Sequence, residues 1–380
     1  MNRPGTKKIR VMIVDDSAVV TALLEYSIGR DPRLEVCATA ASAEDALQIL
    51  GHRRPDVIVM DLLLPGMDGL QATRRIMSQN PVPIVVVAAS TKSGKWNLVA
   101  MEALRAGALT ILEKPLGTTN ADYEAWAQRL CTQLVIMSQV KLVRRTADRA
   151  SRMGSGPDPC STNGGSDRFR MLGIVCSTGG PAALIRLLGD LGPGFPLPIL
   201  LVQHMTDSFI AGFALWLKTV CPFSIVTARD GYVPVAGAVH IAPADHHLRL
   251  QAGVLYLDKG DPVSYQRPSG TILFKSMAES LGADALGVLL TGMGDDGAAG
   301  LLDIRQSGGY TIAEDESTAV VYGMPAAAVR LGAVCESLPL PAIAPRLLGL
   351  AAGRGPAKGA DRISGPNASS GETLFAGEGQ

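Results

Sequence analysis

The chain has 380 residues, which is too long for one hydrophobic core of average size, so two domains are expected. It carries 35 basic and 35 acidic residues, and this zero formal net charge argues against binding to nucleic acid through bulk charge. The six cysteines are scattered and contain no C-x-x-C pair, which predicts reduced thiols in a cytoplasmic protein. No apolar run is long enough for a membrane span, so no membrane-embedded segment is expected.

Strand and helix signals alternate through the first 145 residues. The expected strands are 9–14, 34–39, 56–60, 83–88 and 109–112, and the expected helices are 17–28, 42–50, 69–79, 92–105 and 120–145. Residues 42–45, S-A-E-D, have the spacing of a capping box and mark the start of the second helix. This alternation predicts a doubly wound parallel sheet with its site at the carboxyl ends of the strands.

Charged residues follow three of these expected strands. Asp15 and Asp16 end the first strand, Asp61 ends the third, and Lys114 follows the fifth. Three carboxylates at one sheet edge repel one another unless a cation joins them, and oxygen ligands suit Mg²⁺. One carboxylate could then attack a phosphoryl group, while the metal and the lysine offset the charge on its oxygens. The alternative is a set of solvated acids at strand ends.

This half of the chain resembles the receiver domain of two-component response regulators. The resemblance covers about residues 8–130 and is carried by V-D-D-S at 14–17, V-I-V-M-D-L-L-L-P-G-M-D-G at 57–69 and E-K-P at 113–115. It implies a flavodoxin-like (βα)5 fold in which Asp61 is phosphorylated. It also implies that Asp15 and Asp16 hold Mg²⁺ together with Asp61, and that Lys114 contacts the phosphoryl group.

Two positions depart from the receiver pattern. Ala88 stands where receivers usually have Ser or Thr, and Ile111 stands where they usually have an aromatic residue. Alanine cannot donate a hydrogen bond to a phosphoryl oxygen, although Ser90 and Thr91 are near in sequence. The departures therefore bear on how the signal is transmitted more than on phosphorylation itself.

Residues 146–168 lack apolar periodicity and are rich in Gly, Ser and Pro, so they are expected to form a flexible linker. A coil of this length spans about 25 Å and keeps the first domain at roughly millimolar effective concentration over the second. A weak, phosphorylation-sensitive contact would then be enough to block a site. The composition beyond about residue 351 predicts a disordered tail, 351–380.

The second domain is expected over residues 169–350, again as a mostly parallel, doubly wound α/β fold. Expected strands follow the opening run 172–176 at 198–202, 224–228, 238–242, 248–250, 254–257, 285–290 and 310–313, with helices at 182–188, 209–220, 271–281 and 300–307. Ser177 falls at the bend after the first of these strands. Gly179 and Gly180 leave backbone N–H groups free at the start of the following helix, where an oxyanion could be held. The alternative is a serine N-cap before a glycine-rich turn.

Three strand ends present a serine, a histidine and an aspartate pair. Ser177, His204 and the pair Asp295 and Asp296 follow strands whose carboxyl ends gather along one edge of an open parallel sheet. These residue types are the nucleophile, base and orienting group of acyl transfer. A histidine after a strand is more often structural when it stands alone.

Other motifs compete with this interpretation. G-M-G-D-D-G at 292–297 matches a dinucleotide-binding loop with Glu314 beyond it, but its two aspartates would lie where pyrophosphate must bind. The run D-H-H at 245–247 hints at a metal and is predicted to be a solvated turn. Cys176 alternates away from Ser177 along the strand and is predicted to lie in the core. The order of Ser, His and Asp is not that of the α/β-hydrolases.

The second domain resembles the catalytic domain of the chemotaxis protein-glutamate methylesterases, the CheB family. The similar segments are 176–184, 203–205, 267–269, 291–300 and 321–325, and with the receiver the match covers about residues 8–350. The family typically has alanine at the position of Cys176. Carried over by position, Ser177 is the nucleophile, His204 the general base and Asp296 the orienting acid, and the Met293 N–H is an oxyanion donor.

The resemblance implies hydrolysis of glutamyl methyl esters on methyl-accepting chemotaxis receptors, with deamidation of receptor glutamines as the same chemistry. It implies a histidine kinase of the CheA type as phosphodonor, Mg²⁺ for receiver phosphorylation and no cofactor for catalysis. Two alternatives stay open: a receiver-gated scaffold with an inert triad, and a demethylase of a non-chemotactic signalling array. A DNA-binding output is disfavoured because the second half lacks a basic face and a compact helix-turn-helix.

Overall fold

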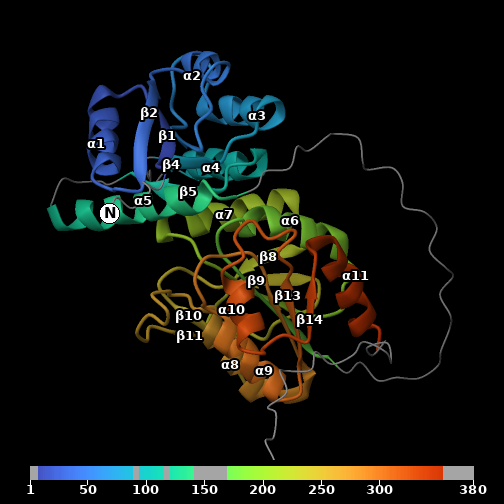
Figure 1. Ribbon diagram of the computed structural model, residues 1–380. Coiled ribbons are helices and arrows are strands. Elements are labelled where there is room, and N and C mark those ends of the chain that lie inside the picture. Colours follow the sequence, from blue (N-terminus) through green and yellow to red (C-terminus); the bar gives the residue numbers. More distant parts are fainter. Residues whose placement is uncertain (1–6, 89–93, 115–119, 141–168, 354–380) are drawn as a thin grey trace, which may run out of the picture.

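The computed structural model describes residues 7–88, 94–114, 120–140 and 169–353, which form two α/β domains, one above the other (Figure 1). The expected linker, 146–168, lies outside the described residues, as does the expected tail apart from residues 351–353. Within the described residues, no helix combines the length and apolar character needed to cross a membrane.

The N-terminal domain is a five-stranded parallel sheet in the order β2-β1-β3-β4-β5, as the alternation of signals predicts. Its strands are β1 (Ile9–Val14), β2 (Leu34–Ala40), β3 (Val57–Met60), β4 (Ile84–Ala88) and β5 (Thr110–Glu113). Its helices are α1 (Ala18–Gly29), α2 (Ala43–Leu50), α3 (Gly69–Gln79), α4 (Gly94–Ala106) and α5 (Asn120–Met137).

Side-chain caps explain where three of these helices begin. Ser17, Ser42 and Asp68 each accept a hydrogen bond from the backbone N–H three residues ahead, which satisfies a donor that the first turn leaves unpaired. Helix α5 differs from expectation, because it ends at Met137 rather than near residue 145. Met137, its last residue, is fully buried, and the next two residues form a turn, after which Val140 still packs against the same core.

The C-terminal domain has a seven-stranded parallel sheet in the order β14-β13-β12-β6-β7-β9-β8 and a separate antiparallel hairpin, β10-β11. Its strands are β6 (Met171–Cys176), β7 (Ile199–Gln203), β8 (Ser224–Thr227), β9 (Ala238–Ile241), β10 (His247–Gln251), β11 (Val254–Asp258), β12 (Ala285–Leu289), β13 (Tyr310–Glu314) and β14 (Glu336–Leu338). Its α-helices are α6 (Gly180–Leu191), α7 (Asp207–Val220), α8 (Gly270–Leu281), α9 (Ala298–Gln306), α10 (Met324–Arg330) and α11 (Leu340–Ala351).

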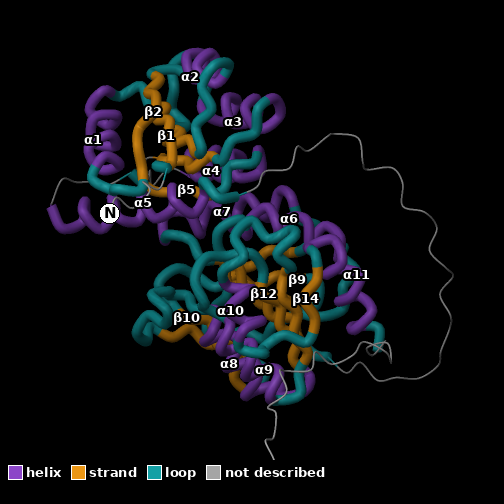
Figure 2. The backbone as a smooth tube through the Cα atoms, viewed as in Figure 1, coloured by secondary structure: helices purple, strands orange, loops and turns teal. Residues whose placement is uncertain are grey.

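Three elements of this domain were not predicted from the sequence. Helix α10, strand β14 and helix α11 follow the last expected strand. The contacts made by α11 with α6 close one face of the sheet, while α8 and α9 cover the other face (Figure 2). Helix α10 and strand β14 are short, with seven and three residues, and give little pattern to read. Helix α11 buries Ile343, Ala344, Leu347 and Leu350 at helical spacing, a signal that the sequence analysis overlooked.

The central strand β6 is buried at every residue, which is typical of a parallel strand with helices on both faces. Its neighbours β7 and β12 are equally buried, so the carboxyl ends of these three strands are rigidly placed side by side.

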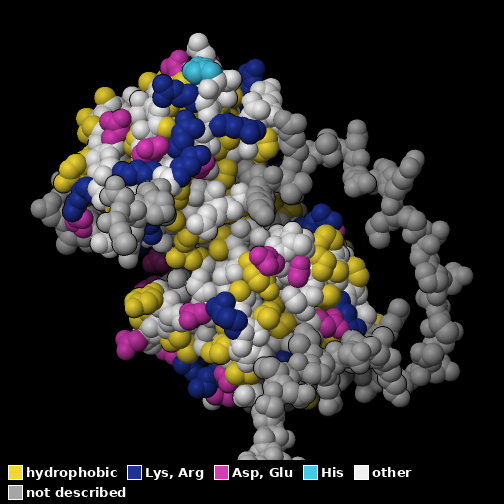
Figure 3. Space-filling view, viewed as in Figure 1, with side chains coloured by type: hydrophobic (Ala, Val, Ile, Leu, Met, Phe, Trp, Pro, Cys, Tyr) yellow, Lys and Arg dark blue, Asp and Glu magenta, His cyan; other side chains and the backbone are white. Residues whose placement is uncertain are grey.

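In the space-filling view, Lys and Arg side chains gather on the visible face of the N-terminal domain, although the chain as a whole has no net charge (Figure 3).

The two domains touch at the edge of the second sheet where the carboxyl ends of its strands lie. Helix α4 packs on α7 and also contacts α6, and the end of β5 lies next to the start of α7 (Figure 1). Among the described residues, three hydrogen bonds cross the contact: Trp216 Nε1 donates to Glu102 Oε1 at 2.9 Å, Ser208 Oγ donates to Glu113 Oε2 at 2.6 Å, and Gln133 Nε2 donates to Met293 Sδ at 3.8 Å. The first domain is thereby placed over the strand ends of the second.

Candidate active site

Ser177 lies at the bend between β6 and α6, where the sequence predicted it. The backbone turns at Gly179, whose φ of 81° favours glycine, and a β-carbon at that position would also clash with Val320. Ser177 N–H donates to Thr291 O at 3.0 Å, which ties the bend to the loop after β12. The serine is therefore held by the backbones of two neighbouring strands.

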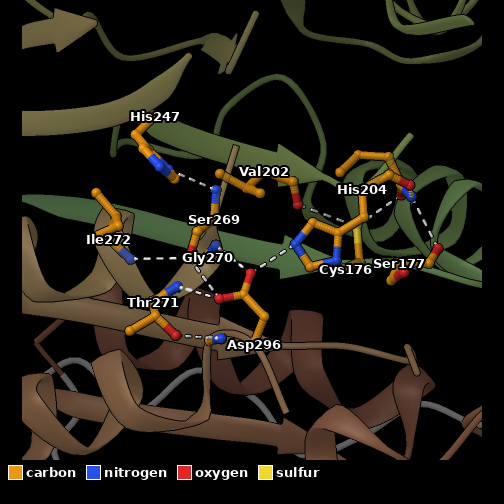
Figure 4. Close-up of polar contacts among 12 residues, drawn as sticks. Cys176, Ser177, Val202, His204, His247, Ser269, Gly270, Thr271, Ile272 and Asp296 are labelled. Atoms are coloured by element: carbon orange, nitrogen blue, oxygen red, sulfur yellow. Dashed lines mark hydrogen bonds and ion pairs between the residues drawn. The ribbon is translucent and has the colours of Figure 1, made fainter. Parts of the chain in front are cut away.

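His204 and Asp296 form a buried pair. His204 Nε2 lies 2.8 Å from Asp296 Oδ2, and both side chains are almost fully buried (Figure 4). An ionised carboxylate only accepts hydrogen bonds, so the pairing places the proton on Nε2 and leaves Nδ1 with a free lone pair. Nδ1 is buried and has no hydrogen-bond partner.

The amino end of α8 stabilises the charge of Asp296. Its carboxylate accepts hydrogen bonds from Ser269 Oγ (2.6 Å), Gly270 N (2.6 Å) and Thr271 N (3.1 Å). Burial alone would raise the pKa of Asp296, but the bonds from His204, Ser269 and Gly270 outweigh it and hold the pKa below its ordinary value. Asp295 is exposed, so the structure separates the roles of the two adjacent aspartates.

Ser177 and His204 line the same cavity, and Figure 4 places Ser177 on the side of the imidazole opposite Asp296. No hydrogen bond joins Ser177 Oγ to His204 in this structure, and in enzymes without substrate such bonds are often long. The three side chains predicted at separate strand ends are thus brought to one edge, with the histidine between the serine and the aspartate.

His247 is a supporting residue that the sequence analysis missed. It was predicted to belong to a solvated turn, but it is 1% exposed. Its Nδ1 accepts from Ser269 N at 3.1 Å, and its Nε2 bonds Asp261 O at 3.0 Å. The prediction was wrong because β10 carries His247 inward, against the start of α8. The histidine orients the residue that donates to Asp296.

The dinucleotide-loop alternative is disfavoured by the surroundings of Glu314. This carboxylate is buried, and its Oε2 accepts from Thr291 N at 2.8 Å. Burial raises the pKa of Glu314, while the bond from Thr291 N opposes that rise. The Gly297 N–H at the start of α9 already donates to Thr271 Oγ1 at 2.8 Å. Neither a ribose-binding carboxylate nor a free helix N–H at Gly297 is available for a dinucleotide.

Met293 lies in the loop between β12 and α9. Its side chain is 39% exposed, and its sulfur lies 3.8 Å from Gln133 Nε2 of the N-terminal domain. The role predicted for Met293 concerns its backbone N–H, which stays a prediction. The loop that carries it is tied to the Ser177 bend through Thr291.

The predicted acidic cluster is present at the strand ends of the N-terminal domain. Asp15, Asp16 and Asp61 can place one carboxylate oxygen each within 4.8 Å of one another, which suits a hard cation such as Mg²⁺. Lys114 Nζ donates to Asp15 Oδ2 and Asp61 Oδ2, both at 2.8 Å. Burial raises the pKa of Asp61, and the neighbouring Lys114 ammonium partly offsets this rise.

Comparison with known proteins agrees with both halves of this description. The family model of the CheB methylesterase matches residues 172–347, and that of the response regulator receiver domain matches residues 11–121. A protein-glutamate methylesterase/protein-glutamine glutaminase 2 of Paramagnetospirillum magneticum is 55% identical over 348 residues, which cover 91% of this chain and 99% of that protein. The chain belongs to the CheB methylesterase family.

A second relative, protein-glutamate methylesterase/protein-glutamine glutaminase 4 of Myxococcus xanthus, is 40% identical and covers 91% of this chain and 98% of its own length. Among solved structures, the CheB methylesterase catalytic domain of Thermotoga maritima is 36% identical, covering 48% of this chain and 98% of that one with a TM-score of 0.46. The family-model matches show that the N-terminal domain is a receiver domain and that the C-terminal domain is of the CheB catalytic type.

The receiver domain covers the CheB-type site. The cavity at Ser177 and His204 is also lined by Leu104, Thr110 and Ile111 of the receiver. It measures about 60 Å³, and since one water needs roughly 10–15 Å³ on this measure, it holds a few waters and no peptide segment. Ile111, one of the two departures from the receiver pattern, therefore faces the hydrolase site.

The other departure, Ala88, is buried at the end of β4, and its carbonyl oxygen accepts a hydrogen bond from Lys114 N at 2.8 Å. Its methyl side chain offers no donor to a phosphoryl group. Ser90 and Thr91, which are close to it in sequence, lie outside the described residues.

Proposed function

We propose that this chain is a phosphorylation-regulated serine hydrolase that removes methyl esters from glutamate residues of chemoreceptors and deamidates their glutamines. The observation that carries the proposal is the buried His204–Asp296 pair, because His204 Nδ1 has no hydrogen-bond partner and His204 lines the same cavity as Ser177. The names of the relatives, which are protein-glutamate methylesterase/protein-glutamine glutaminases, support the substrate class.

In the proposed reaction, His204 Nδ1 takes the proton of Ser177 Oγ as the oxygen attacks the ester carbonyl. The Met293 N–H is a candidate donor to the oxyanion, and one such donor is worth about 10²–10³ in rate. His204 then gives this proton to the leaving methoxide oxygen, or to the amide nitrogen of a glutamine, as its bond to the carbonyl carbon breaks, so methanol or ammonia departs and an acyl-enzyme remains. Water, deprotonated by His204, releases the glutamate. Asp296 stays ionised throughout and stabilises the imidazolium, in keeping with its lowered pKa.

Methanol release from a methylated chemoreceptor tests this proposal. We expect release by the wild-type chain and none above background by Ser177→Ala. A Ser177→Ala chain that is folded and still releases methanol at the wild-type rate would mean that the triad is inert or misassigned. Binding of the receptor without release of methanol by either protein would favour the scaffold alternative.

We further propose that the unphosphorylated receiver inhibits the hydrolase by covering it, with a CheA-type histidine kinase as the phosphodonor to Asp61. When bound, Mg²⁺ at Asp15, Asp16 and Asp61 would offset charge on the phosphoryl oxygens. The small cavity, lined by residues of both domains, supports this regulation. Removing residues 1–145 should raise the rate of methanol release, and an unchanged or lower rate from a folded fragment would count against it.

A further inference from the structure

Gln203 is a buried amide that lies between the two reacting side chains. It is the last residue of β7, it precedes His204, and in the sheet register it lies opposite Cys176, which precedes Ser177. Gln203 is only 2% exposed, so the cost of burying its amide must be met by hydrogen bonds.

Those hydrogen bonds join the nucleophile and the base. Gln203 Nε2 donates to Ser177 O at 2.9 Å and to His204 O at 3.0 Å, so both of its N–H groups are used. Gln203 Oε1 accepts from Cys176 Sγ at 3.0 Å. A flipped amide would set Oε1 against two carbonyl oxygens, so only this orientation pairs every group.

The position of the amide is fixed by packing as well. A β-carbon at position 180 would clash with Gln203 Oε1 and crowd Cys176, so the start of α6 lies directly on the amide. Since Gly180 N–H also donates to Ser177 O at 2.9 Å, that carbonyl oxygen is held from two sides. The Gln203 side chain has little freedom to take another rotamer.

The Gln203 amide joins Ser177 and His204 at the point where the backbone hydrogen bonds of the sheet no longer join them. The last ladder bond between β6 and β7 runs from His204 N to Cys176 O at 3.0 Å. After it the chains part, and Ser177 N bonds Thr291 O on the opposite neighbour. The Gln203 amide therefore spans the gap between the peptide units that carry the nucleophile and the base.

We propose that Gln203 is a positioning residue of the hydrolase, which sets the distance and angle between Ser177 Oγ and His204 Nδ1 by holding both backbones through its two amide N–H groups. This inference rests on the proposed function. In this proposal Gln203 acts through the two backbones that it holds and transfers no proton. A misplacement of about 1 Å costs as much as 10²-fold in rate, so a residue of this kind affects turnover more than binding.

The test compares Gln203→Leu with two control variants in the full chain, activated by a small-molecule phosphodonor and Mg²⁺. Leucine keeps the size of the side chain and removes both donors. Cys176→Ala keeps both donors, and Leu200→Ala destabilises the same strand without touching either carbonyl oxygen. The substrate is a helical peptide with a glutamyl methyl ester, and kcat is divided by the folded fraction from near-ultraviolet circular dichroism.

We expect Gln203→Leu to lower kcat per folded molecule by roughly 10- to 100-fold with KM changed less than about threefold. Cys176→Ala should stay within about threefold, and Leu200→Ala should lower the melting temperature while kcat per folded molecule stays within about twofold. If the Gln203→Leu chain has the wild-type kcat per folded molecule, the proposed positioning role of Gln203 is wrong.

If Gln203→Leu does not fold, Gln203→Met, which loses the same donors on a more flexible side chain, is measured in the same way. Equal kcat losses in Gln203→Met and Leu200→Ala would also overturn the proposal. Failure of the proposed function is recognised separately, because then Ser177→Ala would release methanol as fast as the wild-type chain.

Discussion

Ser208 donates a 2.6 Å hydrogen bond to Glu113, and this bond joins the hydrolase to the residue next to Lys114 of the receiver. Lys114 in turn bonds both Asp15 and Asp61. Lys114, which contacts the proposed phosphorylation residue Asp61, and Glu113, which makes the domain contact, are therefore adjacent at the end of β5. Because Ala88 and Ile111 lack the usual switch side chains, we expect this short connection to carry the signal between the domains.

Loss of the Glu113–Ser208 bond should weaken closure. We expect Glu113→Ala and Ser208→Ala each to raise the rate of methanol release without phosphodonor by about fivefold, since one such bond contributes about 1 kcal/mol. Because both variants remove the same bond, the double variant should add little to either. Additive gains in the double variant would mean that the two residues act independently.

The charge of Asp296 should matter for both rate and stability. Asp296→Asn keeps the shape but loses the anion that orients His204, and we expect kcat to fall by about 10³–10⁴. Because the folded pKa is lowered, ionised Asp296 stabilises the fold above its unfolded pKa, and this stabilisation is lost as pH falls through the folded pKa. Urea unfolding should thus show the variant less stable at pH 7 and the difference shrinking below about pH 4.

The buried Glu314 predicts the opposite dependence on pH. Because its folded pKa is raised, the folded state loses stability as pH rises from the unfolded value of about 4.3 to the folded value. Glu314→Gln keeps an acceptor for Thr291 N and has no charge to bury. The free energy of unfolding of Glu314→Gln relative to wild type should therefore increase with pH through this window. A difference that is independent of pH would contradict a raised pKa.

Removal of divalent metal should separate the two sites. With EDTA, a small-molecule phosphodonor should no longer label Asp61, because the three carboxylates of the cluster then lack their cation. Methanol release by the unphosphorylated chain should be unchanged, since the proposed hydrolysis uses only Ser177, His204 and Asp296. Asp61→Asn, which cannot be phosphorylated at that position, should stay unlabelled with Mg²⁺ present. Loss of basal esterase activity in EDTA would show that the metal also serves the hydrolase.

The strand ends and several helix starts of this protein could be predicted from the local sequence pattern. Strand ends at Asp15, Asp61, Ser177 and His204 follow from apolar runs that stop at polar residues, and caps such as Ser42 follow from short-range spacing. Parallel strands gather their carboxyl ends at one edge, so residues that are distant along the chain could be assigned to two sites before any contact was known.

Contacts between distant segments needed the tertiary structure. Three contacts could not be predicted from the spacing of residues in the sequence. They are the bond of buried His247 to Ser269, the bonds of the Gln203 amide to two carbonyl oxygens, and the Glu113–Ser208 bond. Their partners lie 22, 26 and 95 residues away, and each contact depends on how packed layers bring those partners within hydrogen-bond distance. Sequence alone determined which chemistry the strand ends carry, and folding decided how closely their groups are held and what covers them.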